Sequence, residues 1–308
     1  MPPLSARETV TGDGLRAIRL EAGDLRVETL PELGGKVLSI FNEAIGREFL
    51  WRDPAVPLRR FPPGTSFDDR FIGGFDELLP NDAAERLDGR DLPDHGELWT
   101  AAAGARVEGG AVVLEAELPV SGLRWRRRME IEPPDGLRLE WRIENGGDRP
   151  AIFQWKLHPA LRISPGARIA VPARTAEVGD PAWSRFRGTF RWPDGLDAAG
   201  RPDRADVVPP FDPPAAEFLY ILDLVRGEAA IVHEEEGWAL RLEFPPEVFP
   251  AVQVFASYGG WRGHEVLVLE PTTSWPVSLA GAAARGRTRR LAPGERLAAT
   301  ARLRAGRI

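Results

Sequence analysis

Three successive segments establish the pattern of this chain: AVVLEAEL over residues 111–118, LRWRRRMEIE over 123–132 and LRLEWRIEN over 137–145. In each, apolar residues alternate with arginine or glutamate, which is typical of a strand with one buried and one wet face. The run Arg126-Arg127-Arg128 lies inside this alternation, so we expect it to divide between the two faces rather than form a basic patch. The segments therefore predict three strands of a sheet that covers a core.

Shorter alternating runs recur on both sides of these segments, and no segment shows a sustained helical period with caps. Residues 54–64 predict a surface connection, and residues 168–215 predict a long irregular excursion with one short strand at 188–191. We predict an all-β protein, a large antiparallel β-sandwich that forms a single domain over residues 1–308. The other predicted strands are 15–20, 25–30, 36–41, 217–224, 228–233, 238–243, 251–255, 265–270, a run near 277–279, and 297–303.

Composition excludes several classes of protein. The 308 residues are 43% hydrophobic and 28% charged, as in ordinary soluble globular proteins, and the net charge of -6 argues against a nucleic-acid partner. The absence of cysteine excludes disulfides, thiol nucleophiles and thiolate metal sites. No apolar run is long enough to span a membrane, and residues 1–4 begin no signal-peptide pattern, so we expect a cytoplasmic protein without a membrane partner.

Two apolar runs end in a side chain capable of acid–base chemistry that is followed at once by proline. FQWKLHPAL over residues 153–161 carries His158-Pro159, and the strand at 265–270 ends in Glu270-Pro271. Because proline cannot donate to a strand ladder, each strand stops or meets an edge there, where a sheet opens into a cleft. Taken singly, His158 is better explained as a core histidine bonded to a carbonyl, and Glu270 as a surface glutamate at the end of a strand. The shared arrangement favours a common site.

Two loops carry further polar groups. The segment FIGGFDELLPND over residues 71–82 pairs Gly73-Gly74 with acidic and amide groups, which predicts a backbone that approaches a ligand closely. The segment LPDHGELW over residues 92–99 holds His95 between a proline and a glycine. The other histidines are less promising: we expect His233 to be a solvated turn residue and His264 to have a structural or solvent role.

Together these residues resemble the galactose mutarotase-like, or aldose 1-epimerase, superfamily. The resemblance rests on Gly73-Gly74 with Pro80-Asn81, on His95-Gly96, on His158-Pro159, on Glu270-Pro271 and on the turn LAPGE over residues 291–295, and it covers roughly residues 15–303. It implies a supersandwich of antiparallel strands with a sugar bound in a cleft across one sheet. It also implies an enzyme that interconverts sugar anomers without a metal or organic cofactor.

The resemblance further implies roles for individual residues. Glu270 would be the general base for the anomeric hydroxyl, His158 the general acid for the ring oxygen, and His95 a group that binds and polarises the sugar. Trp261 and Trp275 are candidates for stacking on a sugar face. The other candidate sugar-binding residues are Arg70, Glu77, Asn81 and Asp82, with Glu217 or Asp223 as the counterpart of the family's sugar-binding aspartate.

Ring opening itself requires such a pair, because one proton leaves the anomeric hydroxyl while another reaches the ring oxygen. In the hexose-phosphate branch an arginine precedes the two glycines, whereas Ile72 stands there and Arg70 lies two residues earlier. We therefore do not expect specificity for phosphorylated sugars. Two other interpretations stay open: a sugar-binding protein without turnover, and a glycoside hydrolase or lyase, for which a second flanking carboxylate is missing. The sequence does not indicate the sugar or the oligomeric state.

Overall fold

The strongly alternating segments form the strands that they predict. In the computed structural model, which describes residues 5–308, these are β10 (Ala111–Leu118), β11 (Leu123–Glu132) and β12 (Gly136–Asn145), paired as antiparallel neighbours. The start of the chain, where no signal-peptide pattern is expected, lies outside the described residues. Within residues 5–308 these strands belong to an eight-stranded sheet in the order β15-β21-β22-β26-β12-β11-β10-β9. Its other strands are β9 (Gly104–Glu108), β15 (Arg168–Ala170), β21 (Glu228–His233), β22 (Trp238–Glu243) and β26 (Arg296–Arg307).

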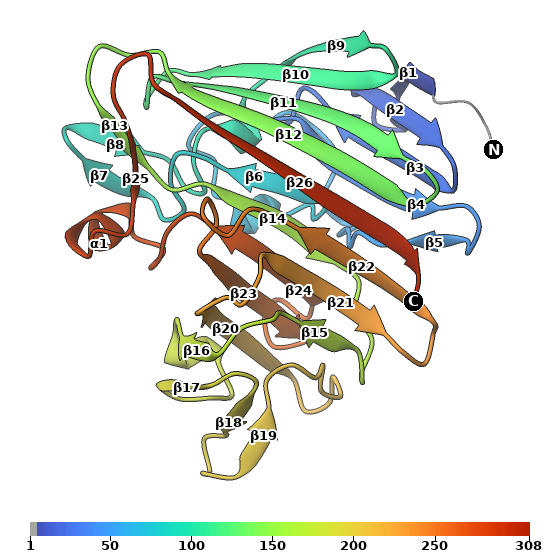
Figure 1. Cartoon of the computed structure of the whole chain (residues 1–308), viewed down its shortest axis with the longest axis vertical. Helices are drawn as coiled ribbons and strands as arrows, with labels where there is room; N and C mark the ends of the chain where they lie inside the picture. Colours follow the sequence, from blue (N-terminus) through green and yellow to red (C-terminus); the bar gives the residue numbers. More distant parts are fainter. Residues whose placement is uncertain (1–4) are drawn as a thin grey trace.

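A larger sheet lies behind the first one in Figure 1 and provides the strands around which the site is built. Over the described residues it has fourteen strands in the order β1-β2-β3-β4-β6-β14-β24-β23-β20-β16-β17-β18-β19, with β5 paired to β4. Its strands are β1 (Ser5–Val10), β2 (Arg16–Ala22), β3 (Leu25–Leu30), β4 (Lys36–Asn42), β5 (Arg47–Glu48), β6 (Phe75–Leu78), β14 (Lys156–Leu161), β16 (Thr175–Val178), β17 (Thr189–Arg191), β18 (Asp194–Leu196), β19 (Pro202–Arg204), β20 (Ala215–Leu222), β23 (Ala251–Tyr258) and β24 (Glu265–Thr272).

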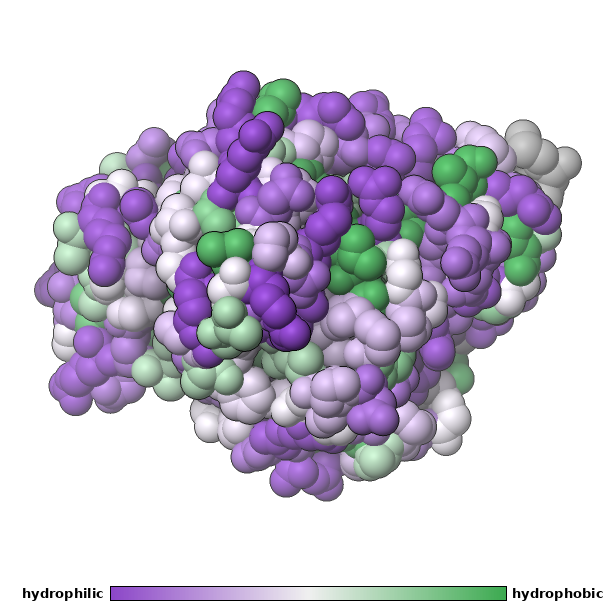
Figure 2. Space-filling view, turned by 90° about the horizontal axis from the view of Figure 1, so that it is seen from below, coloured by the Kyte–Doolittle hydropathy of each residue, from purple (hydrophilic) through white to green (hydrophobic). Residues whose placement is uncertain are grey.

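The two sheets pack face to face as the predicted antiparallel sandwich. β2 and β4 of the larger sheet contact β10, β11 and β26 of the smaller one, and apolar side chains of both sheets form one buried cluster. Burying a single Leu or Val side chain in such a core stabilises the fold by about 1.5–3 kcal/mol. Most of the polar side chains of β10, β11 and β12 alternate with the buried ones and are half-buried or exposed. Figure 2 shows a different side of the molecule, which is mostly hydrophilic with small separate hydrophobic patches. The predicted all-β sandwich is confirmed.

Smaller elements lie beside the sandwich. They are the ribbon of β13 (Ala151–Phe153) with β25 (Arg289–Leu291), the ribbon of β7 (Glu85–Leu87) with β8 (Arg90–Leu92), the helix α1 (Leu279–Ala284), and the 3₁₀ helices η1 (Asp68–Arg70), η2 (Leu98–Thr100) and η3 (Pro181–Trp183). In the described part of the chain no helix is long and apolar enough to cross a membrane.

Four local predictions are wrong. The prediction of one short strand in residues 168–215 is wrong in number: the strand expected at 188–191 is present as β17, but β15, β16, β18, β19 and η3 lie in this segment as well. The alternating run near 277–279 leads into α1, whose first turn is capped by Ser278. His233 is buried and stacks on Trp238 with ring centroids 3.5 Å apart, so it is not a solvated turn residue. Gly73 approaches protein backbone rather than a ligand, because a side chain there would meet the Trp51 carbonyl oxygen at 2.2 Å.

The run of three arginines does divide between the faces, as predicted. Arg127 is buried between the sheets, whereas Arg126 and Arg128 alternate with it on the outer face and pair with glutamates there. The buried guanidinium of Arg127 donates to the Glu77 carboxylate at 2.9 Å. The alternation of the sequence therefore also places the charge of Arg127 inside the core, where the Glu77 carboxylate is its partner.

Candidate active site

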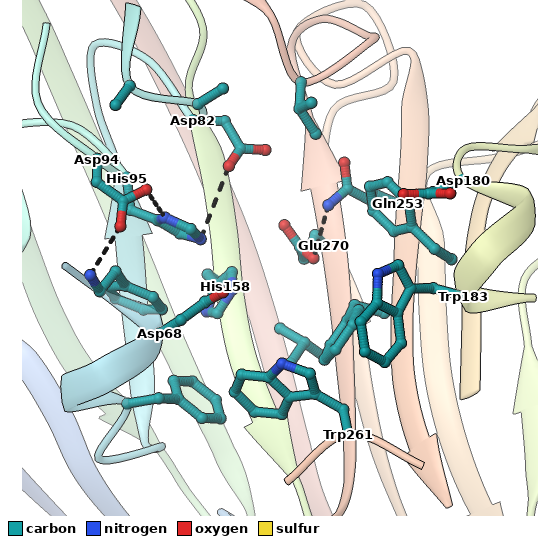
Figure 3. A pocket seen from close by; sticks show the side chains of 18 residues that line it. Asp68, Asp82, Asp94, His95, His158, Asp180, Trp183, Gln253, Trp261 and Glu270 are labelled. Atoms are coloured by element: carbon teal, nitrogen blue, oxygen red, sulfur yellow. Dashed lines mark hydrogen bonds and ion pairs between the residues drawn. The ribbon is translucent and has the colours of Figure 1, made fainter. Parts of the chain in front are cut away.

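A cleft of about 390 Å³ lies over the middle of the larger sheet, on the face that does not pack against the smaller sheet. Figure 3 shows its side chains pointing toward a common space from β14, β23, β24 and the surrounding loops. The lining contains five carboxylates and an aromatic wall. The lining residues are Phe67, Asp68, Phe71, Asp82, Ala83, Ala84, Asp94, His95, His158, Asp180, Trp183, Phe218, Gln253, Phe255, Trp261, Val268, Glu270 and Val277.

Strand periodicity brings the central groups together. Side chains two residues apart on a strand share a face, so Lys156 and His158 of β14 both point to the cleft side of the sheet. Strand β24 pairs with β14 and with β23, and in the second pairing Glu270 lies directly opposite Gln253. The floor of the cleft therefore consists of three neighbouring strands, with His158 and Glu270 on adjacent ones.

Glu270 is almost completely buried, with 1% of its side chain exposed. It accepts a hydrogen bond from Gln253 Nε2 at 3.1 Å on Oε1, and Lys156 Nζ lies 3.7 Å from Oε2. Burial raises the pKa of Glu270 to about 7, an effect that the Lys156 charge opposes and the Asp82 carboxylate reinforces. A carboxyl that titrates near neutrality is suited to acid–base work.

His158 is buried, and its Nδ1 has no hydrogen-bond partner. Its ring meets Phe67 and Phe71 edge-on, with centroids 5.4 and 6.0 Å away. Burial lowers the pKa of His158 well below its ordinary value, and the positive charges of His95 and Lys156 lower it further. Since these ring contacts provide no counter-charge, they too favour the neutral imidazole.

The surroundings of His95 shift its pKa in the opposite direction. Its Nδ1 lies 2.8 Å from Asp94 Oδ1 and its Nε2 lies 3.7 Å from Asp82 Oδ1. Burial opposes the charge on this ring, but the hydrogen bond to Asp94 and the Asp82 carboxylate raise its pKa above the ordinary value. Its ring also stacks on Phe67, with centroids 4.1 Å apart.

The loop that carries His95 adopts an uncommon backbone. His95 has a φ of 56° and Gly96 a φ of 79°, and a side chain at Gly96 would meet the Leu79 carbonyl oxygen at 2.4 Å. Glycine is therefore required at this position. Asn81 fastens the same loop, because its Nδ2 donates to the carbonyls of Ala83 and Pro93 at 2.8 and 2.7 Å.

Five of the sequence-predicted site residues meet in the cleft: Asp82, His95, His158, Trp261 and Glu270. Three others lie outside it. The Asn81 side chain is buried in the loop and supports Asp82 and His95 rather than facing the cleft. Arg70 is exposed at the end of η1 and does not line the cleft. Glu77 points into the core, so its assignment as a sugar ligand is wrong.

The surroundings of Glu77 explain this correction. The indole groups of Trp125, Trp141 and Trp155 donate to its carboxylate at 2.8, 2.8 and 3.0 Å, and Arg127 adds a fourth donor. Side chains alternate between the two faces of β6, so Glu77 points away from the cleft and toward the core.

Three secondary candidates also lie elsewhere. Glu217 is buried against Ser184 and Arg185, and Asp223 accepts a hydrogen bond from Thr175 at 2.5 Å, so neither lines the cleft as the expected sugar-binding aspartate. Trp275 packs under the Arg287 guanidinium, 4.5 Å from its ring centroid. His264 lies outside the lining and faces Asp53 at 3.7 Å, in agreement with a structural role.

Several cleft residues carry no signal in the sequence. Lys156 and Gln253 appear there as ordinary strand residues, and only the pairing of β14, β24 and β23 brings them to Glu270. Asp68 lies on η1, and Asp180 and Trp183 lie on or next to η3, on the opposite wall (Figure 3). Among residues 5–308 no group of three or more His, Asp or Glu side chains is arranged to hold a metal ion.

Comparison with known proteins identifies the fold. No protein-family model matches the chain, and no curated protein matches it in sequence. Solved structures do match: a proposed aldose 1-epimerase from Escherichia coli K12 has a TM-score of 0.70 at 18% identity over 96% of this chain and 100% of that one. A proposed aldose 1-epimerase from Klebsiella pneumoniae has a TM-score of 0.72 at 15% identity, over 98% and 83% of the two chains. A galactose mutarotase-like protein from Clostridium acetobutylicum has a TM-score of 0.66 at 14% identity, over 99% of each chain.

Proposed function

We propose that this chain, which has the galactose mutarotase-like fold, is an enzyme that interconverts the anomers of an unphosphorylated aldose, with Glu270 and His158 as its acid–base pair. The observation that carries the proposal is that these two side chains line one cleft from adjacent strands. A fold alone does not establish an activity, so the proposal depends on this geometry and on the chemistry of the two groups.

Ring opening transfers two protons in one step. Glu270 takes the proton of the O1 hydroxyl, the C1–O1 double bond forms, the bond from C1 to the ring oxygen breaks, and His158 gives a proton to that oxygen. Rotation about the C1–C2 bond then presents the other face of the aldehyde. Ring closure reverses both transfers and yields the other anomer. Each positioned acid or base typically accelerates such a reaction by about 10²–10⁴-fold.

The pair must hold one proton in total for this step. Burial raises the pKa of Glu270 to about 7 and lowers that of His158 well below 6.5, so just below neutral pH the pair carries a single proton, which lies mainly on Glu270. The reactive arrangement, with the proton on His158, is a minor form with the same total charge and therefore the same dependence on pH. Asp94 and Asp82 favour the charged form of His95, and in that form His95 would stabilise the negative charge that develops on the sugar oxygens.

The lining of the cleft supports a neutral sugar as the substrate. Five carboxylates (Asp68, Asp82, Asp94, Asp180 and Glu270) face the space, and no arginine lines it. Carboxylates accept hydrogen bonds from sugar hydroxyls, whereas a phosphate would meet charges of its own sign. The rings of Phe71, Trp261 and Trp183 offer apolar surface for the faces of a sugar.

The proposal is tested by exchange NMR with a panel of free aldoses, in which saturation of one anomeric proton is followed to the other anomer. We expect the protein to accelerate exchange for at least one sugar at neutral pH. Sugar binding that is measurable by titration but is accompanied by no added exchange would identify a carbohydrate-binding protein on the same fold and would contradict the proposal.

A further inference from the structure

The only two lysines of the chain, Lys36 and Lys156, are both buried and both paired with an aspartate. All other basic side chains apart from the histidines are arginines. Lys36 pairs with Asp76, and that pair does not line the cleft. Lys156 instead lies directly beneath the cleft floor, two residues before His158 on the same face of β14. Lys156 takes no part in the proposed proton transfers, although it lies close to Glu270.

The Lys156 ammonium occupies the junction between two walls of the cleft. It donates to the Asp82 carboxylate and to Gln253 Oε1, the latter at 2.6 Å, and it lies 3.7 Å from Glu270 Oε2. The exposed fractions of the Lys156, Asp82 and Glu270 side chains are 1%, 7% and 1%. A compact ammonium with three donors fits between these oxygens, whereas the planar fork of an arginine would not.

A continuous chain of polar contacts thus joins the two sides of the cleft. His95 Nε2 faces Asp82 Oδ1, Asp82 Oδ2 binds Lys156, and Lys156 binds Gln253, which in turn donates to Glu270. The titratable groups that bear on Glu270 come from four elements or loops: Lys156 and His158 from β14, Asp82 from the loop after β6, His95 from the loop after β8, and Tyr220 from β20. Lys156 is the buried cation closest to the carboxylate among them.

We propose that Lys156 is a positioning residue for the acid–base pair: its ammonium, shared between Asp82 and Glu270, keeps the two carboxylates apart and keeps Glu270 able to ionise as a base. The inference rests on the proposed anomer exchange. Without the ammonium, Asp82 and Glu270 would face each other in a buried place with no cation between them. Glu270 would then hold its proton more tightly and would be a poorer base.

The consequence is a pair of shifts of opposite sign. Replacing the cation in Lys156→Met removes an attraction and raises the pKa of Glu270. Replacing the anion in Asp82→Asn removes a repulsion and lowers it. An opposite charge within about 4–6 Å typically shifts a carboxyl pKa by about 1–3 units. If Lys156 and Asp82 served the fold alone, replacing them would not shift the titration of Glu270 in opposite directions.

The experiment follows the ¹³C signal of the Glu270 carboxyl carbon against pH, assigned by its absence in Glu270→Gln. We expect its midpoint to rise by about 1 unit or more in Lys156→Met, to fall in Asp82→Asn, and to lie between these values in the double variant. Lys36→Met removes an equally buried lysine–aspartate pair and is the matched control, for which we expect no shift of this midpoint. Thermal melting of each variant verifies that it is folded.

Anomer exchange is then measured on the same proteins. A rise from about 7 to about 8 lowers the ionised fraction of Glu270 at pH 7 from about one half to about one tenth, so we expect Lys156→Met to lose about fivefold in exchange rate near pH 7. A Glu270 midpoint that stays unchanged in both Lys156→Met and Asp82→Asn would overturn the role of Lys156, whether or not the wild type exchanges anomers. The absence of exchange in the wild type, with the shifts as expected, would instead overturn the proposed function.

Discussion

Burial acts on Glu270 and His158 in opposite directions. It raises the pKa of the carboxyl to about 7 and lowers that of the imidazole well below 6.5, because each group is more easily buried without its charge. In water a free histidine has a higher pKa than a free glutamate, whereas in this cleft the pKa of Glu270 lies above that of His158. This reversal gives the pair one proton over a range of pH that ends near neutrality.

The pH dependence of exchange follows from these directions. We expect kcat/KM to fall as pH rises above about 7, where Glu270 loses the last proton of the pair. We expect it to fall again in acid, well below 6.5, where His158 gains a second proton. Rates measured from pH 4 to 9 (roughly the range that spans both groups) test this expectation. A rate that rises steadily through neutral pH to an alkaline plateau would contradict it.

Glu270 also links stability to pH. Its pKa is raised from 4.5 in the unfolded chain to about 7 in the folded one, so the folded state retains a proton that the unfolded state releases. This contribution favours the fold at acid pH and is lost as pH rises between these two values. We therefore expect Glu270→Gln to gain stability relative to wild type over that window, by about 3 kcal/mol at most.

Urea unfolding at several pH values measures this gain. Glu265→Gln is the matched control, because Glu265 is the exposed first residue of the same strand β24. We expect its difference from wild type to stay within about 0.5 kcal/mol at every pH. A Glu270→Gln variant whose relative stability does not change with pH would show that Glu270 is not held in the protonated state.

At the scale of elements, β6 connects the site to the core. Its neighbouring residues Asp76 and Glu77 point to opposite sides of the sheet, and Glu77 ties three tryptophans and Arg127 from β11, β12 and the segment before β14 into one buried cluster. We expect Glu77→Gln to lower the free energy of unfolding by about 3 kcal/mol or more, because it leaves the Arg127 charge buried without a counter-charge.

Chemical denaturation measures this loss. The comparison is Glu117→Gln on β10, which removes a glutamate that is 82% exposed and faces Arg124. A surface pair of this kind contributes about 0–1 kcal/mol. If the two substitutions cost the same, the Glu77 cluster is not the internal support that its hydrogen bonds indicate.

Long alternating segments were predictable from the sequence, and short ones were not. β10, β11 and β12 each run for eight residues or more, enough for period-2 alternation to stand out. β15, β18 and β19 have three residues each, which is too few to show a period, so only the strand at 188–191 was predicted in the segment 168–215. In the structure β16 to β19 form one edge of the larger sheet, and β15 forms one edge of the smaller sheet. α1, at six residues, is likewise too short for a helical period.

The residues of the site were likewise predictable only in part, because some of them depend on how the whole chain folds. His158 and Glu270 stand out because each follows an apolar run and precedes a proline. The prediction that the strands stop or meet an edge at these prolines is wrong, because β14 and β24 both continue past them inside the larger sheet. Lys156, Gln253, Asp180 and Trp183 do not stand out, because their roles depend on which strands pair and on where η3 lies. Glu77 was assigned to the wrong side because its alternation within β6 is only four residues long. The extent of a single domain over residues 1–308 stays a prediction.

The charge of the whole cleft governs its choice of substrate. Four aspartates line the cleft besides Glu270, and none of the arginines in residues 5–308 does, so the cleft repels an anionic sugar before and during docking. We expect kcat/KM for a free hexose to exceed that for its 6-phosphate by about 100-fold or more at low salt, a difference of roughly 3 kcal/mol. Parallel exchange measurements on the two sugars check this. We expect Asp68→Asn to reduce the ratio of the two kcat/KM values, because it removes one negative charge from the lining. Equal rates would place the phosphate outside the charged part of the cleft and contradict this account.

The most direct test of the central claim is anomer exchange by NMR in wild type, His158→Gln, Glu270→Gln and the double variant, each verified as folded. Since the two groups transfer protons in one step, we expect each single variant to lose about 10²-fold or more and the double variant to lose little beyond that. Single losses that multiply in the double variant would show that the residues act independently. Variants that exchange as fast as wild type would show that His158 and Glu270 are not the acid–base pair.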